Sequence, residues 1–151
     1  MDFHGKQGTL AVVLSLLLLP MCGAMGRAES GPCSQESLKG EYAFTITGQI
    51  LSGPAAGPVT GVAMTHFDGD GILQQVDHVV HNGSLPAMEW RPATGTYTVN
   101  DDCTGAAQIN FTDGSPSLNL RFVLAKHGAE IRTVVSNPGT AITSIGIKDG
   151  W

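Results

Sequence analysis

The feature that most constrains the fold is an alternation of apolar and polar residues with a period of two, interrupted at short intervals by turn residues. In residues 40–51, Tyr42, Phe44, Ile46 and Ile50 alternate with polar side chains. This pattern is typical of a strand with one buried face. Only residues 34–39 allow a short helical turn, and no stretch has a long helical period. The chain is therefore predicted to be all-β.

Turn residues divide the chain into further strands. The segment 68–71 (Asp-Gly-Asp-Gly) supplies the residues that a tight hairpin needs, and residues 100–102 and 138–139 are also turn signals. Residues 84–93 contain two prolines and are predicted to be irregular or an edge. The predicted strands are 40–51, 59–67, 72–81, 94–99, 104–111, 118–125, 130–136 and 140–148.

About eight strands joined mostly by tight turns form an antiparallel meander. A meander of this length curls until its edges meet, which removes the exposed edges that invite aggregation. We therefore predict one domain, residues 29–151, folded as a small closed barrel. The alternative is a two-sheet sandwich, because strand count and turn spacing do not separate closure from face-to-face packing.

The start of the chain resembles an export signal. Residues 10–21 are apolar but too short for a comfortable membrane span of about 20 residues. A signal peptide over residues 1–28, cleaved after Ala28, fits the small residues near that position. The alternative is a lipoprotein signal with Cys22 as the first mature residue. Either way the protein is predicted to be secreted or periplasmic, with no membrane-spanning segment after cleavage.

Charge and cysteine content narrow the choice of partners and compartment. After Ala28 the chain has six Lys or Arg against twelve Asp or Glu, a net charge of −6, with no basic run. Nucleic-acid and peripheral membrane binding are therefore not expected. Two cysteines remain, Cys33 and Cys103. In an exported protein such a pair predicts one disulfide, the alternative being two unpaired thiols or a metal pair.

Three segments together carry a resemblance to a known group of proteins. They are residues 33–44 (Cys-Ser-x-x-Ser-Leu-x-Gly-x-Tyr-x-Phe), the turn at 67–71, and residues 95–105, which end in Asp-Cys-Thr-Gly. The chain resembles small exported bacterial proteins of unassigned function. The resemblance implies a compact barrel similar in outline to the allene oxide cyclase-like and lipocalin-like barrels. These families include both ligand carriers and cyclising enzymes, and no motif in this sequence carries over a catalytic residue from them. No metal and no cofactor are predicted.

Candidate metal sites are weak. His78 and His81 lie three apart in a predicted strand, so they point to opposite faces and cannot share an ion. Asp77 and His81 fall on one face, although a surface or turn histidine is the simpler interpretation. The segment 68–71 has the acidic spacing of a calcium loop but lacks the later ligands. It is interpreted as a turn.

The alternation also predicts which residues face the interior. Tyr42, Phe44, Tyr97 and Phe122 are the candidate ligand-binding residues. An eight-stranded barrel is just wide enough for side chains or for one small ligand, so a filled core and a cavity both remain open. Other residues predicted to face inward are Ile46, Ile109, Leu120, Ile131 and Ile145. If the polar face were interior instead, the site would comprise Glu41, Arg121 and Arg132.

Three functions follow from these alternatives. The favoured hypothesis is a secreted barrel that binds a small apolar or amphipathic ligand among its aromatic residues. The second is a barrel enzyme of the cyclase or isomerase type, with one acid or base such as Glu41 or His66. The third is a structural or adhesive module with a filled core, acting through an apolar patch around Leu85, Met88 and Trp90.

Overall fold

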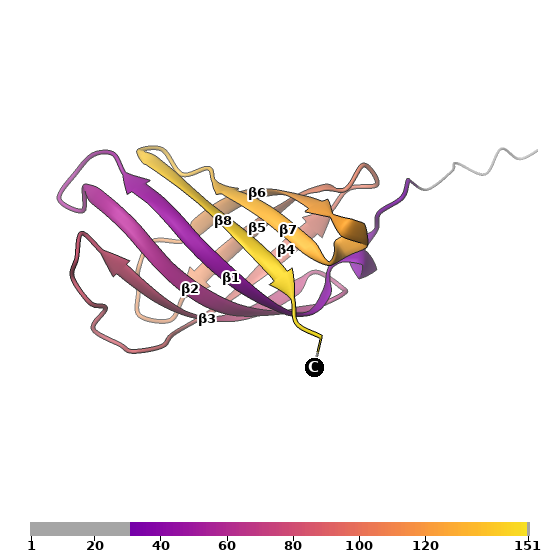
Figure 1. The fold of residues 1–151 in the computed structure, drawn as a ribbon, viewed down its shortest axis with the longest axis horizontal. Coiled ribbons are helices and arrows are strands. Elements are labelled where there is room, and N and C mark those ends of the chain that lie inside the picture. Colours follow the sequence, from indigo (N-terminus) through magenta and orange to yellow (C-terminus); the bar gives the residue numbers. More distant parts are fainter. Residues whose placement is uncertain (1–30, 151) are drawn as a thin grey trace, which may run out of the picture.

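The computed structural model describes residues 31–150, which form a closed barrel of eight antiparallel strands (Figure 1). Each strand pairs with its neighbours in sequence, and β8 pairs with β1 to close the barrel. The predicted meander barrel is confirmed, and the sandwich is excluded. The predicted signal peptide and the alternative lipid attachment at Cys22 lie outside the described residues. The strands are β1 (Lys39–Ile50), β2 (Gly57–Asp68), β3 (Ile72–His81), β4 (Arg91–Val99), β5 (Thr104–Phe111), β6 (Leu118–Ala125), β7 (Glu130–Val135) and β8 (Thr140–Lys148).

Strand β4 begins earlier than the sequence predicts. Residues 91–93 fall in the segment predicted to be irregular or an edge, yet they belong to a strand with a neighbour on each side. Pro92 pairs with Val76, and its carbonyl oxygen accepts a hydrogen bond from the Thr112 amide at 3.2 Å. The proline is thus held in the sheet through its carbonyl, and Arg91 becomes a strand residue that pairs with Asp77.

The two ends of the barrel differ. One end, here called the closed end, holds both ends of the described chain and the turns at 69–71, 100–103 and 126–129 (Figure 1). The 3-10 turns η1 (Gln35–Ser37) and η2 (Lys126–Gly128) lie there too. The other end, here called the mouth, is formed by the four loops at 51–56, 82–90, 112–117 and 136–139.

The N-terminal segment seals the closed end. Leu38 follows η1 and is fully buried. The Tyr97 hydroxyl donates to the Leu38 carbonyl at 2.8 Å and accepts from the Gly69 amide at 2.8 Å. The Gln35 side chain donates to the Tyr97 carbonyl and accepts from the Val99 amide. These bonds satisfy buried polar groups while an apolar side chain fills the opening.

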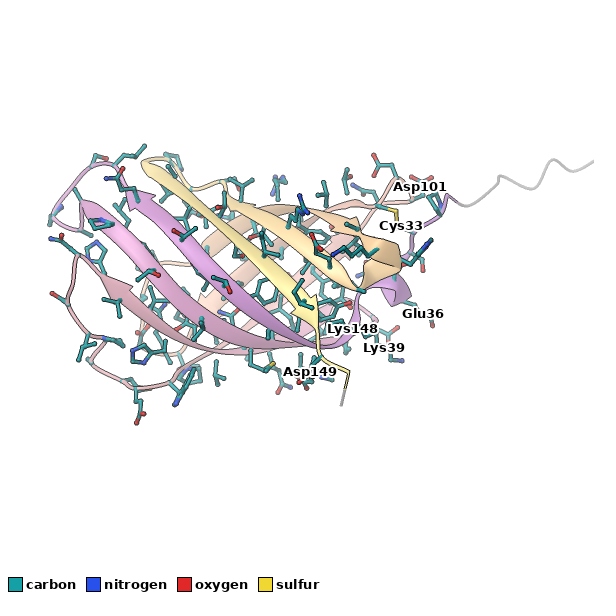
Figure 2. All side chains as sticks on the ribbon, in the orientation of Figure 1. Cys33, Glu36, Lys39, Asp101, Lys148 and Asp149 are labelled. Atoms are coloured by element: carbon teal, nitrogen blue, oxygen red, sulfur yellow. A yellow bond between two sulfur atoms is a disulfide. The ribbon has the colours of Figure 1, made fainter. Side chains whose placement is uncertain are left out.

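A disulfide between Cys33 and Cys103 fastens this segment to the barrel, as predicted. The two residues are 70 positions apart in sequence, and their Cα atoms are 5.1 Å apart. Figure 2 shows the bridge beside Asp101, whose carbonyl accepts a hydrogen bond from the Cys33 amide at 3.3 Å. A structural disulfide is compatible with an oxidising compartment.

The turn between β2 and β3 forms as the sequence predicts. The Asp68 carboxylate accepts hydrogen bonds from the amides of Asp70, Gly71 and Ile72 at 2.7 to 3.0 Å. These bonds, led by that from Asp70, lower the pKa of Asp68. The acidic spacing of this segment therefore serves an internal turn.

Candidate functional site

A large cavity opens at the mouth and runs into the barrel as far as Phe67 and Leu73. Its volume is about 920 Å³, within the range of roughly 300–1,000 Å³ typical of ligand pockets. The walls are predominantly apolar and come from all strands of the barrel and from the mouth loops. The apolar wall residues include Phe44, Ile46, Val59, Ala63, Val79, Ala107, Ile109, Leu118, Leu120, Phe122, Ile131, Val135 and Ile142.

Two aromatic rings of the cavity wall lie over glycines. Phe44 is paired with Gly146 on β8, and Phe122 with Gly105 on β5. A Cβ atom at Gly105 would lie 2.2 Å from the Phe122 ring, and one at Gly146 would lie 2.5 Å from the Phe44 ring. The rings therefore occupy room on the wall that side chains at these positions would otherwise fill. The filled-core alternative does not describe this part of the barrel.

One charged pair, with a buried carboxylate and a partly exposed guanidinium, lies in the cavity wall. Asp77 on β3 is 2% exposed, and Arg91 on β4 donates to both of its carboxylate oxygens at 3.0 Å. This fork geometry is the strongest way to pair these two groups and offsets the cost of burying them. The Arg91 guanidinium also lies over the Phe111 ring, 3.7 Å from its centre, in a cation–π contact.

Further polar groups continue along the wall from this pair. The Thr65 hydroxyl donates to the Gln75 side-chain oxygen at 3.0 Å, and the Gln75 nitrogen lies 3.4 Å from an Asp77 oxygen. On β7 and β8, the Thr133 and Ser144 hydroxyls lie 2.6 Å apart. The cavity is thus an apolar chamber with a few convergent polar groups.

His81 adds an imidazole at the end of β3. It lines the cavity, and its Nε2 atom is buried without a hydrogen-bond partner among residues 31–150. A buried polar atom of this kind is ready to bond a group that the chain itself does not supply. His78, three residues earlier, points to the opposite face of the strand, as predicted: its Nδ1 bonds the Glu89 carbonyl, and its ring packs on Trp90.

The four predicted ligand-binding residues divide into two pairs. Phe44 and Phe122 line the cavity. Tyr42 and Tyr97 lie behind its floor, because each ring packs edge-on against Phe67 with centroids 5.4 and 5.1 Å away. Tyr42 donates its hydroxyl proton to the Gly128 carbonyl at the closed end. Burial, followed by the nearby Tyr97, raises the pKa of Tyr42 to about 12.

Other residues considered from the sequence lie outside the barrel. Glu41 and His66 form a pair at 2.8 Å, with both side chains 49% exposed, so neither reaches the cavity. Arg121 and Arg132 also point outward, and Arg132 bonds Glu130 at 2.6 Å. The interior is therefore the apolar face. The expectation for Ile145 was wrong: it is exposed, because Ile142, Ser144 and Gly146 are the residues of β8 that face inward.

The apolar residues of the loop at 82–90 surround the mouth. Leu85, Met88 and Trp90 are all exposed, and Leu85 and Met88 also line the outer part of the cavity. Leu85 and Met88 of the patch that the sequence indicated are thus part of the cavity rim, and Trp90 lies outside it.

The Asp77–Arg91 pair was missed as a site from the sequence alone. Asp77 shares its strand face with Leu73 and Val79, which is the signal that would have placed it inside. Its partner Arg91 lies in the segment predicted to be irregular or an edge, so the sequence did not indicate which residue pairs with Asp77.

Comparisons with protein families, curated proteins and solved structures found no match. Within residues 31–150, no three His, Cys, Asp or Glu side chains are grouped so that they would hold a metal ion. The same part of the chain contains no helix with the length and apolar character to cross a membrane.

Proposed function

We propose that this protein is a secreted or periplasmic carrier that binds a small apolar or amphipathic molecule inside its barrel. The observation that supports the proposal most is the cavity of about 920 Å³, with apolar walls and a few inward polar groups. Burying an apolar ligand there gains roughly 0.8 kcal/mol for each methylene group removed from water.

The location of the cavity supports the same function. It opens at the mouth, and the disulfide and the seal formed by Leu38 lie at the other end. A ligand can enter and leave through the four loops while the closed end stays bonded. Loops carried on a rigid scaffold are where binding residues are commonly found.

Native mass spectrometry of protein purified from its own host tests the proposal directly. We expect an added mass that is lost on denaturation. The matched variants Ala63→Phe and Ala43→Phe test where it binds, because Ala63 lines the cavity and Ala43 is exposed on the same sheet. Ala63→Phe should remove the added mass, and Ala43→Phe should keep it. Equal occupancy in both folded variants would contradict binding in the barrel.

A cyclase or isomerase is a second candidate because the cavity is lined by two carboxylates, those of Asp77 and Asp113, and by the imidazole of His81. Isomerisation conserves mass, so an enzyme would co-purify with two compounds of equal mass and different chromatographic retention. Asp77→Asn should then shift the ratio toward the substrate. A single compound, or two compounds whose ratio is unchanged by Asp77→Asn, would leave the carrier as the function.

A further inference from the structure

The charges that face the cavity are few and unbalanced. Among the described residues that line it, Asp77, Asp113 and Arg91 are the charged side chains, which give −1 when His81 is counted as neutral. A charge brought into a low-dielectric cavity is costly unless it is paired there. Whether a charged ligand can bind therefore depends on whether one of these three side chains is free to pair with it.

Arg91 has little left to offer an anion. Its Nε and Nη2 atoms bond Asp77 at 3.0 Å, and its Nη1 atom lies 3.5 Å from the Ser115 hydroxyl and 3.9 Å from an Asp113 oxygen. A ligand carboxylate would have to displace Asp77 from Arg91 or remain beside two carboxylates of the same sign. Either outcome opposes binding of an anion.

The cavity residues do not favour a cationic ligand either. Both oxygens of Asp77 are bonded to Arg91. Asp113 is bonded to the Ser115 amide at 2.9 Å and faces the Arg91 guanidinium. A ligand ammonium would thus compete with a fixed guanidinium for the same oxygens.

Uncharged hydrogen-bonding groups are available instead. In the Thr133–Ser144 pair one hydroxyl donates to the other, so the second hydroxyl retains its proton for another acceptor. Thr65 donates to Gln75 and keeps its own oxygen lone pairs. These groups match an alcohol or amide, which both donates and accepts hydrogen bonds.

We infer that the ligand of this cavity is a neutral amphiphile, with an uncharged hydroxyl or amide headgroup on an apolar body, and that Asp77 and Asp113 disfavour fatty-acid-like anions. This inference rests on the proposed function of the barrel as a ligand carrier. Asp77 thereby acts as a specificity-determining residue: it binds Arg91 and so withholds that guanidinium from ligands.

The test compares three ten-carbon ligands that differ only in headgroup: decanol, decanoate and decylammonium. Each displaces the neutral fluorescent probe N-phenyl-1-naphthylamine from the purified, disulfide-bonded protein, below the concentration at which the ligand forms micelles. We expect decanol to bind at least about tenfold more tightly than either ion.

Charge-neutralising variants separate two contributions to the preference for decanol: the effect of the cavity charges and the general cost of burying an ion. Asp77→Asn should raise the affinity for decanoate relative to decanol by about tenfold, because it releases Arg91 and removes the net negative charge. Asp113→Asn removes the same charge without breaking the Asp77–Arg91 pair, so it tests the effect in a protein whose wall is intact. Asp149→Asn is the matched control, since Asp149 lies at the closed end (Figure 2).

The possible results distinguish the two proposals. Preferential binding of decanoate or decylammonium by the unmodified protein overturns the inference and leaves the carrier function standing. The inference is also overturned if the ratio of the affinities for decanol and decanoate is the same in Asp113→Asn as in Asp149→Asn. A protein that binds neither the probe nor any of the three ligands overturns the proposed function itself.

Discussion

At the scale of single residues, side chains that share one alternation pattern lie at different depths in the barrel. Tyr42, Phe44, Tyr97 and Phe122 all face inward, as the alternation predicts. Alternation specifies the face of a strand but carries no information on distance from the mouth. The two tyrosines bond carbonyls at the closed end, and the two phenylalanines line the cavity. The sequence could thus predict the interior but not which of its residues line the cavity.

Tyr42 makes the free energy of unfolding depend on pH in the alkaline range. Its pKa is about 12 in the folded protein, against 10.0 for an ordinary tyrosine. Above pH 10 the unfolded chain releases this proton first, so the free energy of unfolding falls as pH rises through 12. Urea unfolding from pH 8 to 11.5 should show the decline, and Tyr42→Phe should make it shallower. Identical slopes in the two proteins would contradict the burial of this phenol.

The Asp77–Arg91 pair shows a second limit of what local sequence can predict. Asp77 falls on the apolar face of its strand, where a lone carboxylate is unfavourable. Its partner Arg91 lies 14 residues away, beyond a loop of irregular composition. Local pattern therefore identifies each residue separately but not the pair, which depends on the register between β3 and β4.

At the scale of elements, the register between strands determines the shape of the cavity wall. Gly105 faces Phe122 between β5 and β6, and Gly146 faces Phe44 between β1 and β8. A bulky residue beside a glycine on the next strand covers the exposed backbone and leaves the centre of the barrel open. Strand positions were predictable because turn residues mark their ends. The cross-strand pairing of glycine with phenylalanine across the β1–β8 seam was not, since it requires closure.

Gly105→Ala should destabilise the protein by roughly 1–3 kcal/mol, the usual cost of overpacking. The new Cβ atom would lie 2.2 Å from the Phe122 ring and 2.4 Å from the backbone oxygen of Thr98. Equilibrium unfolding in urea measures the change. Gly150→Ala is the control, because no heavy atom lies within 4 Å of the Cβ position there. Equal midpoints for the two variants would show that the Phe122 ring does not occupy this position.

At the scale of the whole molecule, closure and the disulfide divide the barrel into a sealed half and an open half. The sequence favoured closure over a two-sheet sandwich, because closure pairs the two edge strands that a meander leaves exposed. It also predicted the Cys33–Cys103 bridge from cysteine count and export. The sequence did not predict whether the barrel holds a cavity, because the interior volume depends on the side chains of all eight strands together.

Removing the bridge tests how far the sealed half supports the rest. The double variant Cys33→Ser, Cys103→Ser should lose about 4 kcal/mol of stability, given a loop of 70 residues in the chain-entropy treatment. Thermal unfolding without reductant measures the loss. The unmodified protein in excess reductant should unfold at the same temperature as the variant. A variant as stable as the oxidised protein would mean that the bridge adds nothing to the fold.

The position of the chain ends has a practical consequence. Gly31 lies near Asp101, and Asp149 bonds Glu41, so both ends of the described chain leave the barrel at its base. A tether or fusion partner attached at either end would sit on the side away from the mouth (Figure 2). The barrel can therefore be immobilised on a sensor surface, or displayed on a larger protein, with its opening turned to the solution.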